Sequence, residues 1–250
     1  MDTAVPFAGC GDRIAAMTMH SSNHREAPRV DQPPIIGILL AAGRSTRMGL
    51  NKQLLPWPPG STDGMTVAAA SFDLLVRVAT RVVLVEGASP ELLRAALLPR
   101  SFVPTAGAPD GEMLESLKLG LIAADMLRRA ELDARSALAS AEGTSNLDPH
   151  RGWYLLHLAD HPAVRESTMV TLRAHALANP EGVVIPEHDG RGGHPAFVPA
   201  SWGSRILGWR GPDGLAGLWR SCADEVERVP LDDPGVRVDL DTPGEYHAHR

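Results

Sequence analysis

The chain has 250 residues, of which 44% are hydrophobic, so it is long enough to bury a substantial core. Charged residues make up 22% of the chain and the formal net charge is -6, which argues against a nucleic-acid partner bound through a broad basic surface. Cys10 and Cys222 show neither a CxxC nor a Cys/His spacing, and the longest apolar stretches are too short to cross a bilayer. We therefore expect a soluble protein of the reducing cytoplasm, without a membrane partner.

Residues 1–34 mix Pro, Gly, Ser and charged residues without helical or alternating periodicity, and Pro33 and Pro34 end the stretch. It lacks a basic start followed by a continuous apolar run, so it does not indicate a secretory signal. We interpret residues 1–34 as a disordered extension and residues 35–250 as one domain.

From Ile35 onward, short β-branched or aliphatic runs alternate with helical patterns, which is typical of βαβ units. The predicted strands cover residues 35–41, 81–85, 102–105 and 154–158. The predicted helices cover residues 65–79, 90–97, 112–127 and 166–178. Because strands covered on both faces are continuously apolar, these runs predict an α/β fold with a single doubly wound, mainly parallel sheet and helices on both faces.

The end of the chain has a different pattern. Residues 183–199 predict two short strands around a glycine-rich turn, which would form a small hairpin at one edge of the sheet. Two further strands are predicted at residues 227–231 and 236–240. Residues 129–151, rich in Ala, Ser and Glu, predict a helix extension followed by a loop.

A loop rich in glycine and basic residues follows the first predicted strand. Gly43 and Gly49 permit close approach of the backbone to a ligand. Arg44, Arg47 and Lys52 supply three cations within nine residues, at the carboxyl end of a strand where open α/β sheets bind ligands. The spacing fits neither Walker A nor GxGxxG, so the residues alone leave an ordinary surface turn equally open.

The segment 39–57, LLAAGRSTRMGLNKQLLPW, resembles the LAAGxSxRMGxxKxLLP loop of the MobA-like nucleotidyltransferases, which include molybdenum-cofactor cytidylyl- and guanylyltransferases. The resemblance implies a Rossmann-like nucleotidyltransferase fold and a loop whose backbone surrounds the base and the triphosphate. It implies that Arg47 and Lys52 contact phosphates and, with Asp160, form the catalytic set. The nucleotide-binding residues that it implies are Leu40, Ala41, Ala42, Gly43, Arg44, Arg47, Lys52 and Ser116.

Ser116 enters this set through a looser match. Ser116, Leu117 and Gly120 fit the GMxxSLxxG element that shapes the family's nucleotide site. Helix capping and packing account for this segment nearly as well.

A triphosphate needs a counter-charge, which Mg²⁺ supplies when one or two carboxylates hold it. Asp160 follows the predicted strand 154–158 in the sequence ADHP, so it emerges at the same sheet edge as the loop. The sequence resembles the family's GDMP or VDHP, whose Asp binds the metal; the alternative is that Asp160 only caps the next helix. His161 either contacts the acceptor or packs beside Pro162.

A second carboxylate motif lies near the C-terminus. DLDTPGEY, residues 239–246, resembles the family's DIDTPEDY motif, whose first Asp is the usual metal ligand. The resemblance therefore implies Asp160 and Asp239 as magnesium ligands. Alternation along a strand places Asp241 on the same face as Asp239, although Asp-Thr-Pro is also a good helix start.

Residues 190–195, GRGGHP, resemble the RxGHP element of the molybdopterin cytidylyltransferase-like branch. The acceptor-binding residues expected on this basis are Arg191 and His194, joined by His161 and Asp241. The alternative is a hairpin turn with a solvated arginine.

Together the resemblances imply a magnesium-dependent nucleotidyltransferase that moves a nucleoside monophosphate from an NTP to a phosphorylated acceptor and releases pyrophosphate. The acceptor that they imply is molybdopterin. CTP is favoured over GTP because the GHP and DxDTP elements are similar to those of the cytidylyl branch. A molybdoenzyme is the protein partner that the resemblance implies. Three alternatives stay open: a transferase acting on a sugar 1-phosphate or another small phosphate, an oxidoreductase of the MobA-like group, and a non-catalytic nucleotide-binding partner of a molybdenum hydroxylase.

Overall fold

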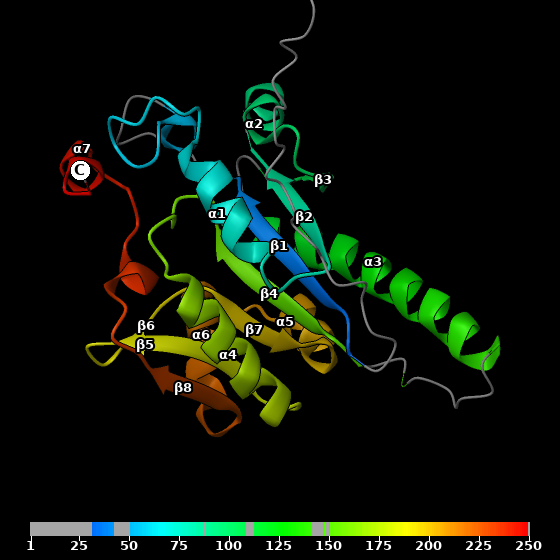
Figure 1. Ribbon diagram of the computed structural model, residues 1–250. Helices are drawn as coiled ribbons and strands as arrows, with labels where there is room; N and C mark the ends of the chain where they lie inside the picture. The colour runs from blue at the N-terminus through cyan, green and yellow to red at the C-terminus, as the bar shows by residue number, and fades with distance from the viewer. Residues whose placement is uncertain are drawn as a thin grey trace, which may run out of the picture.

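An eight-stranded sheet lies at the centre of the described part of the protein (Figure 1). The structure, a computed structural model, describes residues 32–42, 51–87, 89–108, 113–141, 148 and 151–249. Nearly all of the predicted extension therefore lies outside the described residues, as do Gly43, Arg44 and Arg47 of the predicted nucleotide loop.

The sheet is mostly parallel, as predicted. Its strands are β1 (Ile35–Ala41), β2 (Arg81–Glu86), β3 (Val103–Ala106), β4 (Trp153–Leu158), β5 (Val183–His188), β6 (Arg191–Gly192), β7 (Ala196–Pro199) and β8 (Val226–Pro230). They follow the order β3-β2-β1-β4-β7-β5-β6, with β8 paired to β5. β1 is parallel to β2 and β4, β3 is parallel to β2, and β8 is parallel to β5. β7 runs antiparallel to β4 and β5, and β6 antiparallel to β5.

Helices cover both faces of the sheet, which confirms the predicted doubly wound fold. The described α-helices are α1 (Val67–Leu75), α2 (Pro90–Leu97), α3 (Met113–Ala141), α4 (Glu166–Ala178), α5 (Gly203–Gly208), α6 (Gly214–Ser221) and α7 (Pro243–His247). One core cluster joins the sheet to α1, α2 and α4, with Phe72 and Leu172 among its members. The other joins it to α3, α5 and α6 through residues such as Leu117, Ile206 and Leu218. Burial on both faces explains the continuously apolar β1, in which six of the seven residues are buried.

Most element bounds follow the sequence pattern closely. α2 and α4 have the predicted bounds. α1 begins two residues later than predicted because the Thr66 side chain caps it by accepting from the Ala69 N–H, and it ends at Leu75, four residues before the predicted end. α3 continues to Ala141, which confirms the predicted helix extension.

Two predictions for the C-terminal part need correction. The predicted two-stranded hairpin contains three strands, because β6 pairs with β5 around Asp189 and Gly190, and β7 returns between β5 and β4. The prediction of a strand at residues 236–240 is wrong. All five residues are described. The chain there forms the 3-10 helix η4 (Pro234–Arg237), and the residues after it are extended but pair with no strand of the described sheet. Pro234 and the Asp233 cap on the Gly235 N–H favour the turn over a strand.

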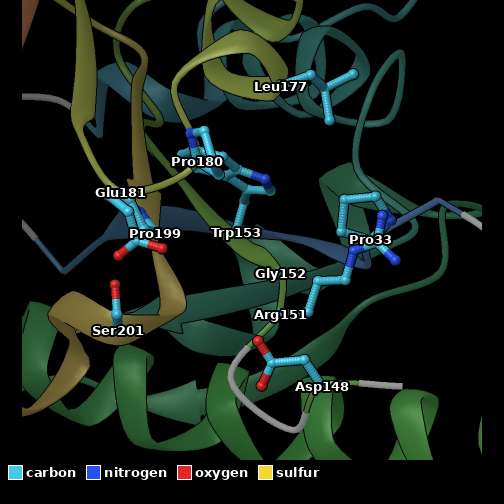
Figure 2. Close-up of a pocket in the computed structure, with 10 residues that line it drawn as sticks. All are labelled: Pro33, Asp148, Arg151, Gly152, Trp153, Leu177, Pro180, Glu181, Pro199 and Ser201. Carbon is cyan, nitrogen blue, oxygen red and sulfur yellow. The ribbon is translucent and has the colours of Figure 1, made fainter. Parts of the chain in front are cut away.

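The two edges of the sheet differ in chemistry. The edge where β4 begins borders a cavity of about 260 Å³ (Figure 2), lined by Pro33, Asp148, Arg151, Gly152, Trp153, Leu177, Pro180, Glu181, Pro199 and Ser201. The opposite edge, where β1 and β4 end, carries the polar residues singled out by the sequence. None of the helices in the described part of the chain combines the length and hydropathy that a membrane span requires.

Candidate active site

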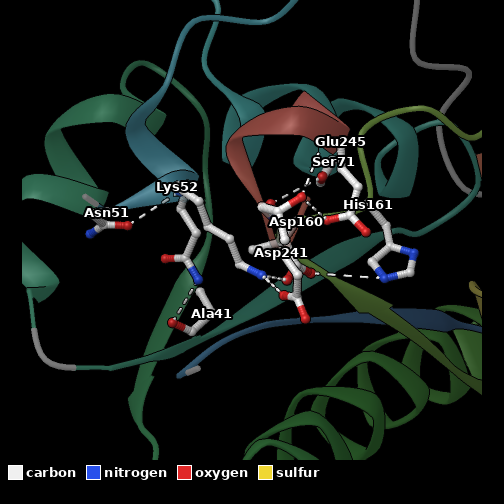
Figure 3. Close-up of polar contacts among 11 residues, drawn as sticks. Ala41, Asn51, Lys52, Ser71, Asp160, His161, Asp241 and Glu245 are labelled. Atoms are coloured by element: carbon white, nitrogen blue, oxygen red, sulfur yellow. Dashed lines mark hydrogen bonds and ion pairs between the residues drawn. The ribbon is translucent and has the colours of Figure 1, made fainter. Parts of the chain in front are cut away.

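Asp160 is held by the sheet at the carboxyl edge of β1 and β4. These strands pair in parallel up to Leu40 and Leu158, and the Ala159 N–H continues the pairing by donating to the Leu40 carbonyl at 3.0 Å. From the other side, the buried Ser71 hydroxyl of α1 donates to the Ala159 carbonyl at 3.2 Å (Figure 3). The backbone immediately before Asp160 is therefore fixed on both sides.

Lys52 meets two of the predicted acidic residues. It begins the 3-10 helix η1 (Lys52–Leu54), and only 8% of the residue is exposed. Its Nζ lies 2.5 Å from Asp160 Oδ2 and 2.6 Å from Asp241 Oδ1 (Figure 3). Burial lowers the pKa of the Lys52 ammonium, but the charges of Asp160 and Asp241 and its hydrogen bonds to them outweigh burial and raise that pKa. Lys52 therefore stays protonated at neutral pH.

A buried amide, Gln53, ties η1 to the end of β1. Its Nε2 donates to the Ala41 carbonyl at 3.0 Å, and Asn51 caps η1 by accepting from the Gln53 N–H. Sequence reasoning missed Gln53, because a buried glutamine next to a charged lysine carries no local pattern of its own. It brings Lys52 to the strand end where the predicted nucleotide residues Leu40, Ala41 and Ala42 lie.

Ser116 lies at the same edge, in the first turn of α3. Its hydroxyl accepts from the Ala108 N–H at 2.9 Å and is buried. A Cβ added to Gly107 would come within 2.6 Å of the Ala42 Cβ and 3.1 Å of the Ser116 Oγ. The structure therefore brings Ser116 beside Ala42, and it also shows the packing and hydrogen bonding that the sequence left as the alternative.

Asp239 and Asp241 follow η4 on the extended segment. Val238 and Leu240 pack into a small cluster with Val67 and Tyr246, so the intervening Asp239 and Asp241 face away from that cluster. Alternation thus gives the predicted common face although the ladder pairing is absent from these described residues. Asp241, rather than Asp239, is the acid that pairs with Lys52.

The acidic residues crowd one another. Partial burial raises the pKa of the Asp239 carboxyl, although much of the residue is exposed, and the charges of Asp241 and Asp160 raise it further, against an opposing contribution from His161. Within the described residues, no group of three His, Cys, Asp or Glu side chains is arranged to hold a metal ion by itself. Asp160 and Asp241 pair with one ammonium, and Asp239 adds a third carboxylate close enough to interact with both acids, so the site keeps excess negative charge. That charge suits a divalent cation that completes its coordination with phosphate oxygens and water.

His161 packs behind Asp160 with two other histidines. Its ring centroid lies 6.3 Å from that of His157 and 5.2 Å from that of His194. Burial is the main cause that lowers the imidazole pKa of His157, His161 and His194, and it lowers that of His194 to about 3. These rings are therefore neutral at pH 7. His161 Nε2 lies 4.0 Å from Asp160 Oδ1.

Arg191 lies apart from the histidines, exposed on β6, where it pairs with His188. It forms no ion pair with another described residue, so its side chain is available to an anionic ligand. The GRGGHP segment therefore separates into an exposed cation and the packed imidazole of His194.

The comparisons with known proteins agree with this fold. Residues 37–228 match the family model for the MobA-like NTP transferase domain, which is well over half of the chain. The chain therefore belongs to the MobA-like NTP transferase family, and its fold and family are those of a nucleotidyltransferase, as predicted.

One curated relative matches over a short stretch. The probable molybdenum cofactor guanylyltransferase of Rhodopirellula baltica is 57% identical over 35 residues, which cover 14% of this chain and 17% of that protein. The chain thus matches less than a fifth of that relative's length.

Solved structures show the same fold over most of the chain. Rv0371c from Mycobacterium tuberculosis aligns with a TM-score of 0.65 and 23% identity, covering 86% of this chain and 97% of its own. A nucleotidyl transferase from Methanothermobacter thermautotroptrophicus aligns with a TM-score of 0.64 and 21% identity, covering 87% and 96%. A complex of Rv0371c with manganese aligns with a TM-score of 0.62 and 21% identity, covering 86% and 97%.

Proposed function

We propose that the protein is a magnesium-dependent enzyme that transfers a nucleoside monophosphate from an NTP to a phosphorylated acceptor of the molybdopterin type and releases pyrophosphate. The observation that carries the proposal is the meeting of Lys52, Asp160 and Asp241 at the carboxyl edge of β1 and β4, the strand end where Leu40, Ala41 and Ala42 lie. The catalytic unit proposed is the single domain of residues 35–250, within which the family match lies.

Asp160 and Asp239 are the proposed magnesium ligands. The raised pKa of Asp239, caused by burial and by its acidic neighbours, supports a cation here, because bound positive charge relieves that repulsion. When bound, Mg²⁺ would neutralise triphosphate charge and stabilise the charge that develops on the departing pyrophosphate. The manganese complex of Rv0371c supports a divalent cation in this fold.

Lys52 and Asp241 then have distinct parts. Asp241 orients the Lys52 ammonium, which stays protonated and donates to phosphate oxygens of the nucleotide. Arg47, which lies outside the described residues, is proposed as the second phosphate-binding cation. The protein supplies position and charge, and an oxygen of the acceptor phosphate attacks the α-phosphorus directly.

The protonation states of the histidines limit which residues can bind the acceptor phosphate through charge. Because His161 and His194 are neutral at pH 7, they contribute hydrogen bonds or packing rather than charge. Arg191 is therefore the proposed contact for the acceptor phosphate. A molybdoenzyme that receives the product and a cytoplasmic location complete the proposal.

CTP is the proposed nucleotide because the GHP and DxDTP elements are similar to those of the cytidylyl branch. GTP is the second candidate, since the curated match over 35 residues is to a probable guanylyltransferase. The two are separated by their pyrophosphate yield under identical conditions.

The test is a pyrophosphate-release assay on the full chain with Mg²⁺, molybdopterin and each of CTP, GTP, ATP and UTP. We expect release with CTP that requires both metal and acceptor and is lost in Asp160→Ala. Release with a sugar 1-phosphate in place of molybdopterin would move the assignment to another transferase of the family. Release that survives Asp160→Ala, or no release with any acceptor despite nucleotide binding, overturns the mechanism and favours the oxidoreductase or non-catalytic alternatives.

A further inference from the structure

Asp233 joins two segments of the chain that each lead to the site. Its Oδ2 accepts from the Arg165 N–H at 2.9 Å and from the Thr168 hydroxyl at 2.6 Å, both at the start of α4. Its Oδ1 accepts from the Gly235 N–H at 2.9 Å, in η4. Asp233 is only 2% exposed although its neighbour Asp232 is exposed, so these donors replace its hydration.

The two joined segments carry the proposed metal ligands. Asp160 precedes Arg165 by five residues, and Asp239 follows Asp233 by six. Between them the backbones touch, since a Cβ on Gly235 would lie 2.1 Å from the Ala163 carbonyl oxygen. The junction at Asp233 therefore links the two backbone segments that carry these carboxylates.

The hairpin strand end packs on the same junction. The His194 N–H donates to the Val236 carbonyl at 2.9 Å, and a Cβ on Gly193 would lie 2.1 Å from that carbonyl oxygen. The buried Gly235 and Val236 thus lie between the loop after β4 and the end of the hairpin. The segment beyond them has no ladder partner among the described residues, so its starting point is set here.

We propose that Asp233 is a positioning residue that sets the spacing between Asp160 and Asp239 for divalent-cation binding. The inference rests on the proposed function, which assigns those two carboxylates to the metal. Residues that orient metal ligands without touching the metal change metal affinity by about 10- to 100-fold when substituted. Asp233 contacts neither ligand directly and acts through the backbone on either side of it.

The substitution Asp233→Asn tests this at almost constant volume. An amide offers one accepting oxygen, so whichever way it turns, either the Arg165 N–H or the Gly235 N–H faces an NH₂ donor in place of an acceptor. The link between α4 and η4 is therefore broken on one side. Asp232→Asn is the matched control, because it makes the same charge change one residue away on an exposed side chain.

The measurement is Mn²⁺ binding to the full chain, followed by the EPR signal of the free ion. We expect Asp233→Asn to weaken Mn²⁺ binding about tenfold or more and Asp232→Asn to stay within about twofold. The Mg²⁺ concentration that gives half-maximal pyrophosphate release should rise in parallel, with most of kcat recovered at saturating metal. A lower melting temperature with unchanged Mn²⁺ affinity would mean a role in folding only and would overturn the inference.

A milder variant decides the matter if Asp233→Asn does not fold. Thr168→Val removes one hydrogen bond to Oδ2 and keeps both N–H contacts, so we expect Mn²⁺ binding to weaken about two- to threefold. Unchanged affinity in Thr168→Val overturns the proposal in that case.

Asp160→Asn separates this inference from the proposed function. If it binds Mn²⁺ as the wild type does, the assigned metal site is wrong. If Asp160→Asn loses the ion and Asp233→Asn keeps full affinity, the metal site stands and only the role of Asp233 fails.

Discussion

Asp160 and Asp241 contact the same ammonium but are held in place by different means. Asp160 follows β4, whose first five residues are buried, and the backbone before it is hydrogen-bonded to β1 and α1. Asp241 follows η4, outside the sheet; it pairs with Lys52 and adjoins the small cluster around Leu240 and Tyr246. One acid is thus fixed by the core, and the other lies on a segment outside the sheet.

The difference predicts where substitutions should have the larger effect on local opening and on activity. A residue held by many buried contacts opens only together with the core, so losing one hydrogen bond there changes local opening little. Losing one contact on the C-terminal segment removes a larger fraction of what holds it. Local opening and activity should therefore be more sensitive on the Asp241 side than on the Asp160 side.

The largest effect is expected from Asp160→Asn, which removes a proposed metal ligand without moving the segments. We expect pyrophosphate release to fall about 1,000-fold, the scale for deleting one electrostatic element of a site. The melting temperature should change little, since the sheet holds the backbone. Asp232→Asn provides the exposed control, and a fall of less than about tenfold in Asp160→Asn would contradict the assignment.

Lys52→Met should have the next largest effect, on both parts of the site. It removes the proposed phosphate contact and leaves Asp160 and Asp241 without their shared cation, so we expect activity to fall about 100-fold. Hydrogen exchange should quicken in residues 238–246 and stay unchanged in β4. Equally faster exchange in both regions would contradict the expected difference between the C-terminal segment and β4. Lys52→Arg, which keeps the charge, is the control.

The raised pKa of Lys52 fixes the pH range of its contribution. A lysine whose folded pKa exceeds its unfolded value stabilises the fold fully below the unfolded value of about 10.4. That contribution is lost only as pH rises through the folded pKa. The exchange difference between wild type and Lys52→Met should therefore be the same at pH 7 and pH 9.

Much of the fold was predictable because buried parallel strands leave a continuous apolar signature. Ile35–Ala41 and the bounds of α2 and α4 follow directly from the sequence. Residues 236–240 alternate like a strand, but Pro234 and the Asp233 cap turn the chain, and no neighbouring strand in the described residues takes up the pairing. Alternation reports which side chains are buried, and hydrogen-bond partners depend on the rest of the fold.

The sequence predicted where the candidate site lies better than it predicted which side chains contact one another there. A strand end followed by an acid places Asp160 at the ligand edge by topology alone. The Lys52–Asp241 contact joins residues 189 positions apart, and local pattern carries no information about such a pair. Asp233 and Gln53 were missed for the same reason, since their partners lie on other elements.

Asp239→Asn and Asp241→Asn should act in opposite directions on stability. Burial and acidic neighbours raise the pKa of Asp239, and a carboxyl with a raised folded pKa is destabilising when ionised. Asp239→Asn should therefore slightly raise the melting temperature of the metal-free protein at pH 7, and this gain should vanish below a pH of about 4. Asp241→Asn should lower it, because Lys52 loses a partner.

The same two substitutions also distinguish the proposed metal ligand, Asp239, from the residue proposed to orient Lys52, Asp241. Asp239→Asn should weaken Mn²⁺ binding about tenfold, and Asp241→Asn should do so by less than about threefold. The reverse order would exchange the proposed roles of the two acids.

The smallest effect is expected from removing one hydroxyl from each tyrosine of the chain. Tyr246 Oη donates to the Pro56 carbonyl at 2.7 Å on the C-terminal segment, and Tyr154 Oη donates to Asp125 Oδ1 at 2.8 Å in the core. Tyr246→Phe should cost about 1 kcal/mol, and Tyr154→Phe at least as much because its partner is a carboxylate. If the core distributes such a loss, pyrophosphate release should fall about twofold in Tyr246→Phe and stay unchanged in Tyr154→Phe, despite the latter's greater loss of stability. Equal changes in activity would show that both parts of the site are held with the same stiffness.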